Sequence, residues 1–206
     1  YSIDGVATGV DENTQILLYE LVNSQPKIVD TLIVTNGKFS GEYPKAENIN
    51  MRYFHFVKEK SNLLFFPEND DLKVILYKDS IQSSFVIGGA QNEAYTSFTR
   101  KQRSFNETKQ ENIERIKLAR NQQDNNLFVQ IQSENKELAA EELAYKKGFI
   151  KDNNNSIFSM MLLSEMISRK EVTSVEATNL VENLSPKIAA LPLTGDIKAA
   201  ITAMKQ

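Results

Sequence analysis

The sequence predicts an α+β protein of two segregated parts, an N-terminal antiparallel β-sandwich or barrel of seven or eight strands followed by an all-α helical bundle. Up to Gly89, short segments rich in β-branched and aromatic residues recur at roughly ten-residue spacing, which is typical of such sheets. From Ala90 to about Lys147 the chain contains no glycine or proline, and its apolar residues follow helical spacing. We therefore expect a β-sandwich domain at residues 1–89 and a helical domain at residues 90–206.

The first half consists of strand-like segments separated by turn residues. The segments lie at 2–8, 15–21, 27–34, 38–43, 51–57, 62–66 and 72–77, and a further strand precedes Gly88. Turn residues lie between them at 11–13, 23–26, 36–37, 44–48 and 68–71. Asn36-Gly37 is the clearest hairpin signal, because both residues tolerate the positive φ of a type I′ turn.

The second half is expected to be helical throughout. The polar run at 122–126 favours a turn between two long amphipathic helices. Further helices are expected around 157–169, 175–184 and 197–204, with breaks at 153–156, 185–186 and 193–195. Thr173 and Glu176 have the spacing of a capping box, which predicts that a helix begins there.

Composition excludes several kinds of chemistry. The chain has no cysteine, no tryptophan and one histidine, so it offers no thiol nucleophile, disulfide or cysteine-ligated zinc. With 24 basic and 27 acidic residues the net charge is −3, which argues against a nucleic-acid partner. No apolar run is long enough to span a membrane. The chain begins with tyrosine, which we attribute either to a cleaved export signal or to the choice of the expressed segment.

His55 is the first candidate for chemistry. Alternation places Tyr53, His55 and Val57 on one strand face and Phe54 and Phe56 on the other. A ligand or general base needs partner groups, and no motif marks any near His55. We therefore interpret His55 as a structural residue on the less buried face of a sheet.

Two other local patterns have structural interpretations. The acidic turn Glu68-Asn-Asp70-Asp71 offers oxygen ligands but lacks the spacing and closing glutamate of an EF-hand loop, so we interpret it as a solvated turn. A hydrolase that uses Asp70 and Asp71 is the alternative. Gly88-Gly89 lies between a strand and a helix but lacks the residues of a phosphate-binding loop, so we interpret it as a bend at the domain boundary.

Five residues are candidates for a ligand or partner surface. Tyr95, Phe98 and Phe105 fall on one helical stripe, which packs against a neighbouring element or lines a ligand groove. Met160 and Met161 belong to an apolar segment too wide for a single stripe, so this helix is either buried between neighbours or faces a partner. We expect no catalytic residue, metal ligand or cofactor.

The order of several motifs resembles a known bacterial region. Residues 28–41 hold a hairpin motif, Leu64-Phe-Phe-Pro-Glu-Asn69 an aromatic strand end, and Val86-Ile-Gly-Gly89-Ala-Gln-Asn92 a strand-to-helix junction. Residues 149–156, 184–186 and 195–201 continue the order in the helical half. The sequence is similar to a domain of unknown function, with its helical region, at the N-terminus of periplasmic thiol-disulfide oxidoreductases of the thioredoxin-like, AhpC/TSA-associated type. Gly89 and Asn154 stand where serine and proline are usual in that family.

The resemblance implies a function outside catalysis. Relatives of this kind perform redox chemistry with a Cys-x-x-Cys pair in a C-terminal thioredoxin-like domain, and no residue here matches that pair. The expected function is an accessory region, for substrate recognition, positioning or dimerisation, in a periplasmic or cell-envelope protein. Expected partners are a thioredoxin-like domain in cis and a second copy, with membrane contact only through an upstream lipid anchor. The alternative is a stand-alone exported binding module for a small molecule or peptide.

Overall fold

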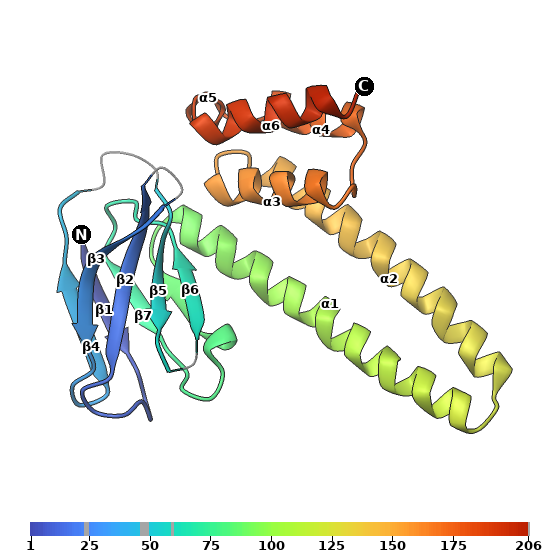
Figure 1. The fold of residues 1–206 in the computed structure, drawn as a ribbon, viewed down its shortest axis with the longest axis horizontal. Helices are drawn as coiled ribbons and strands as arrows, with labels where there is room; N and C mark the ends of the chain where they lie inside the picture. The colour runs from blue at the N-terminus through green and yellow to red at the C-terminus, as the bar shows by residue number, and fades with distance from the viewer. Residues whose placement is uncertain (23–24, 46–49, 59, 206) are drawn as a thin grey trace. The chain divides into compact units, whose positions relative to one another are not determined.

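The computed structural model describes residues 1–22, 25–45, 50–58 and 60–205 (Figure 1). The chain forms two compact units, the β-unit (Tyr1–Thr96) and the helical unit (Ser97–Gln206). The predicted α+β class with segregated parts is confirmed. The division between the units falls within helix α1 (Ala90–Asn121), beyond the boundary expected at Gly89. The domain division at 89/90 stays a prediction.

The β-unit consists of two four-stranded sheets in the described part of the chain. Sheet A has the order β4-β1-β7-β8 and sheet B the order β3-β2-β5-β6. The strands are β1 (Ser2–Val6), β2 (Gln15–Val22), β3 (Gln25–Ile33), β4 (Lys38–Glu42), β5 (Arg52–Phe56), β6 (Ser61–Phe65), β7 (Leu72–Ile75) and β8 (Phe85–Ile87), and a 3-10 turn lies at Ile81–Ser83. No described ladder joins the two sheets into a closed barrel.

One pair of strands departs from the antiparallel expectation. β1 and β7 run parallel, whereas the other described pairs are antiparallel. Between these two strands the chain forms β2 and β3 of sheet B, β4 of sheet A, and β5 and β6 of sheet B, and it then re-enters sheet A in the direction of β1. Local alternation predicts a strand but carries no information about the direction of a distant neighbour.

Alternation along β5 separates the core from the surface. Phe54 and Phe56 are buried, and Phe54 stacks on Phe65 with 4.7 Å between the ring centroids. Tyr53 and His55 lie on the opposite face and are half-buried. Burial of one large apolar side chain contributes about 1.5–3 kcal/mol, so such alternation is sufficient to orient the strand. The predicted orientation of Phe54 and Phe56 is confirmed.

The Asn36-Gly37 turn connects the two sheets. Both residues have positive φ, 53° and 68°, and Thr35 and Lys38 form the bridge that closes the turn. The predicted type I′ signal is therefore confirmed, although the strands on either side enter different sheets. Two other expected turns include residues 23–24 and 46–48, which lie outside the described residues.

The start of α1 is joined to the end of β6 within the β-unit. The Asn92 side-chain oxygen accepts from the Phe66 N–H (2.8 Å), and its amide nitrogen donates to the carbonyls of Phe66 (2.7 Å) and Gly88 (2.8 Å). One residue earlier, the Glu68 carboxylate accepts the Gln91 N–H (2.7 Å) at the helix N-terminus, where a negative charge is favoured.

Gly88 and Gly89 form the bend before this helix. Their φ values are 115° and 77°, which favour glycine. A Cβ at Gly88 would lie 2.5 Å from the Asp71 carbonyl oxygen, and one at Gly89 would lie 2.4 Å from a Glu68 carboxylate oxygen. The predicted bend is confirmed, and both glycines allow close approach of the 68–71 turn.

The helical unit begins with two long helices joined by a tight turn. α1 is followed by α2 (Asn125–Asp152), and the Asp124 side chain accepts from the Leu127 N–H (2.9 Å) at the start of α2. The expected turn in 122–126 is confirmed. Arg115 of α1 forms an ion pair with Glu134 of α2, which ties the two helices together.

Four further helices follow in the described residues. They are α3 (Ile157–Ser168), α4 (Ser174–Glu182), α5 (Pro186–Ala189) and α6 (Pro192–Ala203). The capping box of Thr173 and Glu176 at the start of α4 is confirmed. The break predicted at 193–195 is wrong, because α6 begins at Pro192, whose fixed φ suits the first helical position.

Candidate functional site

The outer side of sheet B has no formally charged acidic or basic side chain over its paired rows. The register of β2, β3, β5 and β6 places twelve described residues on this side. They are Gln15, Leu17, Tyr19, Leu21, Pro26, Ile28, Thr31, Ile33, Tyr53, His55, Asn62 and Leu64, which we call the uncharged face. None is lysine, arginine, aspartate or glutamate, whereas the solvated side of an antiparallel sheet is normally polar.

Aromatic rings occupy the centre of the uncharged face. Tyr19 and Tyr53 are cross-strand neighbours and stack with ring centroids 5.2 Å apart, and the His55 ring meets Tyr19 edge-on at 6.2 Å. His55 Nδ1 is 2.7 Å from the Asn62 side-chain oxygen. Around this centre, Ile28 is 52% exposed. Tyrosine-rich, charge-depleted surfaces of this kind are enriched at the centres of protein–protein interfaces.

The outer side of sheet A differs in character. The exposed side chains of Asp4, Lys38, Glu42 and Lys73 lie on its strands β1, β4 and β7. This side has the polarity expected of a sheet surface in water. The absence of charge is therefore a property of one side of the β-unit, within the described residues.

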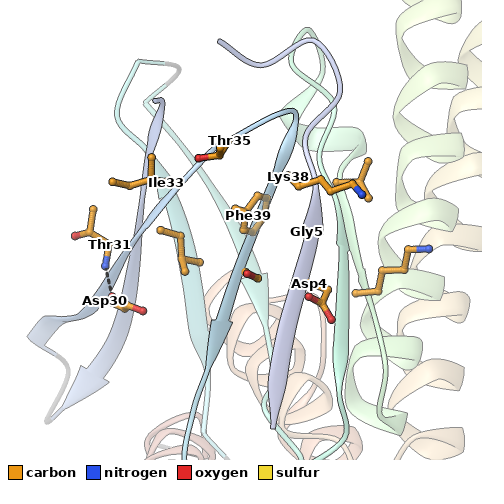
Figure 2. A pocket seen from close by; sticks show the side chains of 12 residues that line it. Asp4, Gly5, Asp30, Thr31, Ile33, Thr35, Lys38 and Phe39 are labelled. Carbon is orange, nitrogen blue, oxygen red and sulfur yellow. Dashed lines mark hydrogen bonds between the residues drawn. The ribbon is translucent and has the colours of Figure 1, made fainter. Parts of the chain in front are cut away.

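A groove lies between the edge strands β3 and β4, with a volume of about 670 Å³ (Figure 2). We call it the β3–β4 groove, and it is lined by Asp4, Gly5, Val6, Asp30, Thr31, Leu32, Ile33, Thr35, Lys38, Phe39, Ser40 and Lys73. The buried side chains of Leu32 and Phe39 line its apolar part. Its volume is in the range of pockets that hold small ligands.

Two contacts close the ends of the groove. At one end Thr35 and Lys38 exchange backbone hydrogen bonds of 2.8 and 3.1 Å. At the other, the Tyr43 hydroxyl donates to Asp30 Oδ2 (2.8 Å), whose Oδ1 accepts the Thr31 N–H (2.7 Å). Burial and the adjacent Asp30 carboxylate raise the pKa of Tyr43, so the phenol stays a donor at neutral pH.

Gly5 is the reason that Phe39 can lie close to β1. A Cβ at Gly5 would lie 2.2 Å from the Phe39 ring, so the ring packs directly on the glycine backbone. Phe39 also meets Phe54 edge-on, with centroids 6.1 Å apart. The apolar part of the groove is thus fixed by the core.

The stripe Tyr95, Phe98 and Phe105 divides between the two units. Tyr95 meets Phe66 edge-on in the β-unit, with 5.6 Å between centroids. Phe98 and Phe105 are buried in the helical unit and both contact the Tyr145 ring, at 5.7 and 5.9 Å. A binding role for Phe98 or Phe105 would require these rings to leave this packing.

The two methionines of α3 differ in burial. Met160 is fully buried, and the Thr194 hydroxyl is 3.6 Å from its sulfur. Met161, the next residue, is half-buried. Of the five sequence candidates, Tyr95 and Met161 therefore keep an exposed portion, and contact with a partner stays a prediction for both.

The acidic turn is tied to the N-terminal strand and lies apart from the β3–β4 groove. Asp71 Oδ1 accepts the Ser2 N–H (2.8 Å), and this hydrogen bond lowers the pKa of Asp71. Neither Asp70 nor Asp71 lines the β3–β4 groove. In the described residues no three His, Cys, Asp or Glu side chains gather in a way that could hold a metal ion.

Both candidate surfaces depend on long-range pairing. The uncharged face requires the register of four strands, and its only sequence signal is the alternation around His55. The groove depends on β3 and β4 entering different sheets. The register that joins the four strands of the uncharged face, including the bulge between Leu18 and Tyr19, carries no local sequence signal.

The β-unit matches one family model. Residues 1–95 match a family described as a domain of unknown function, DUF4369. Neither a curated protein nor a solved structure was found to match the chain. The resemblance to a domain of unknown function is thus confirmed for this region, and the link to thiol-disulfide oxidoreductases stays a prediction. Among the described helices, none has the length and apolar character needed to cross a membrane.

Proposed function

We propose that this chain is the non-catalytic accessory region of an exported thioredoxin-like thiol-disulfide oxidoreductase. In this proposal the β-unit binds a protein surface and thereby recognises or positions the reacting partners. The observation that carries the proposal is the uncharged face. Exposure of Tyr19, Tyr53 and their aliphatic neighbours to water is unfavourable, and burying them against a partner recovers that free energy.

The proposed occupant of the uncharged face is the thioredoxin-like domain of the same polypeptide. The 206 residues contain no cysteine, so thiol chemistry must come from another segment. Covalent linkage gives that segment a high effective concentration, and an apolar contact of moderate area is then sufficient to hold it. A second copy of the chain, or a folded substrate protein, is the other outcome that the experiments below distinguish.

The proposed location is the periplasm or cell envelope, with a lipid anchor upstream as the membrane link. The motif order in the β-unit supports this placement, because relatives with these motifs are exported proteins. The net charge of −3 fits a partner that is neither nucleic acid nor an anionic membrane surface.

The gene provides the first test. The proposal predicts that the reading frame continues beyond the codon for Gln206 into a thioredoxin-like segment with a Cys-x-x-Cys pair. A stop codon at that point would contradict the occupant in cis.

A charge on the uncharged face provides the second test. Tyr53→Lys in the full polypeptide should release the thioredoxin-like domain, and limited proteolysis between the two parts should become several-fold faster. Tyr77→Lys, at an exposed tyrosine outside this face, is the matched control and should leave the rate unchanged. Equal rates for both variants would contradict the proposal, and a dimer in sedimentation velocity that Tyr53→Lys dissociates would replace the partner in cis by a second copy.

A second candidate function is supported by the β3–β4 groove. Its volume and its buried Leu32 and Phe39 suit an independent binding module for a small molecule or peptide.

A further inference from the structure

The groove is bordered by the edge of β4, whose outer backbone groups are unpaired in the described structure. On its other side β4 pairs with β1, where Ala7 N–H donates to Gly37 O (2.8 Å) and Tyr43 N–H to Tyr1 O (2.9 Å). Backbone groups of odd-numbered residues in this strand therefore point to β1. Those of Lys38 point the other way, to Thr35.

Alternation extends this pattern along β4. Ser40 and Glu42 have the same parity as Lys38, so their N–H and C=O groups point away from β1. No described residue bonds these groups, and Ser40 itself lines the groove. An unpaired strand edge is a template for another strand.

At single positions on the other sheet edges, side chains hydrogen-bond to outward backbone groups. At the end of β6, Asn92 bonds both backbone groups of Phe66, and the Thr96 hydroxyl donates to Val86 O (3.3 Å) on β8. On β3, the Asp30 carboxylate takes the outward Thr31 N–H. On β4, Ser40 and Glu42 are two successive outward positions whose backbone groups have no described partner.

We propose that the β3–β4 groove binds an extended polypeptide segment, which adds to sheet A as a strand beside β4. Backbone hydrogen bonds with Ser40 and Glu42 would supply sequence-independent affinity. Side chains on the inward parity would pack on Leu32 and Phe39, which favours valine or isoleucine there. This site is separate from the aromatic centre of the uncharged face, so it stands or falls independently of the proposed partner in cis.

The charges that line the groove favour certain side chains at the outward positions of the bound segment. Asp30 is already engaged by Thr31 and Tyr43, and no ion pair of Lys38, Lys73 or Asp4 occurs among the described residues. The lining of the groove therefore contains two lysines and one aspartate that form no described ion pair. An acidic side chain at the outward position nearest Lys38 complements this arrangement, and a basic one opposes it.

The test uses the 206-residue chain and the peptide acetyl-Thr-Val-Glu-Val-Thr-Val-amide. In a titration followed by backbone amide NMR, Ser40 and Glu42 should shift, and their amide hydrogens should exchange several-fold more slowly with peptide bound. N-methylation of one set of alternate peptide residues should abolish binding, while methylation of the other set should leave it, because only one edge of the peptide meets β4.

A charge exchange tests the orientation. Lys38→Glu should weaken binding of the glutamate peptide roughly threefold to tenfold and strengthen binding of its lysine counterpart by a similar factor. Lys136→Glu, an exposed lysine on α2, makes the same change in net charge and should do neither. Binding that both methylated peptides retain would show a small-molecule pocket instead of a strand site. That outcome, an absence of binding at millimolar peptide, or shifts confined to the helical unit would each overturn the proposal.

Discussion

The Asn92 side chain hydrogen-bonds the backbone of Phe66 as a neighbouring β-strand would. It accepts from the Phe66 N–H at 2.8 Å and donates to the Phe66 carbonyl at 2.7 Å, and all of these groups are buried. The two sequence motifs at 64–69 and 86–92 therefore meet in space and act together. Their role in the structure is to close a sheet edge and to fix the start of α1.

Removing this amide should destabilise the β-unit. Asn92→Ala leaves the N–H and C=O of Phe66 and the C=O of Gly88 without their partner, and the expected loss is about 3 kcal/mol. Asn92→Asp keeps the acceptor but turns both donations into oxygen–oxygen repulsion around a buried charge, so its loss at pH 7 should be at least as large as that of Asn92→Ala. Urea unfolding followed by the amide signals of the strands measures both variants. Asn62→Ala, on the outer side of sheet B, is the control, and an effect as large as that of Asn92→Ala would contradict this role.

The two bend glycines should differ in their tolerance of a side chain. A Cβ at Gly88 meets a backbone oxygen of Asp71, whereas one at Gly89 meets the movable end of Glu68. Both substitutions strain a positive φ, which costs about 1–2 kcal/mol. Gly88→Ala should therefore lower the unfolding free energy by more than Gly89→Ala, and the reverse order in thermal unfolding would be inconsistent with the structure.

Glycine to alanine should have opposite effects in the two units. Gly5→Ala forces the Phe39 ring away from β1 and should destabilise the β-unit by about 1–3 kcal/mol, with loss of the apolar part of the groove. Gly148→Ala lies inside α2, where the added methyl group meets no atom, and should stabilise the helical unit by about 0.5–1 kcal/mol. Equal destabilisation by both variants would rule out the packing described for Gly5.

The capping box of α4 should depend on pH. The hydrogen bond from Lys147, followed by those from the backbone N–H and hydroxyl of Thr173, lowers the pKa of Glu176 from 4.5 to about 2. Because the folded value lies below the unfolded one, this stabilisation is complete above pH 4.5 and is lost as the pH falls toward 2. Glu176→Gln should be less stable than the native chain at pH 7, and the difference should close over that interval.

A neighbouring glutamate provides the control for that experiment. Glu182→Gln removes the same charge from α4 without touching Thr173 or Lys147. Its stability relative to the native chain should change far less between pH 7 and pH 2. If the difference in unfolding free energy between Glu176→Gln and the native chain did not change with pH, the Glu176 charge would contribute nothing to stability.

Local features of the fold could be predicted because their causes lie within a few residues. Alternation around Phe54 predicted which side chains of the strand are buried. Asn36-Gly37 specified a turn because both residues accept positive φ. The spacing of Thr173 and Glu176 specified a helix start. The break placed at Gly195 failed because Pro192 initiates the helix and tertiary contacts outweigh the glycine's low helix propensity.

Features that depend on distant partners could not be predicted in this way. The parallel pairing of β1 with β7 joins residues about seventy positions apart, and no local pattern encodes it. A bulge between Leu18 and Tyr19 resets the register with β3, so the row that brings Ile28 beside Tyr19 cannot be counted from the sequence. The uncharged face and the groove both rest on such pairings.

Hydroxyl-radical footprinting of Tyr19 and Tyr53 tests most directly whether the uncharged face is covered by a protein. The 206-residue chain and the longer polypeptide that the proposed function predicts would be oxidised under the same conditions, with the exposed Tyr77 as internal reference. We predict that oxidation of Tyr19 and Tyr53 falls several-fold in this longer polypeptide while that of Tyr77 stays the same. Equal oxidation of Tyr19 and Tyr53 in both samples would contradict the claim that this face is a binding surface.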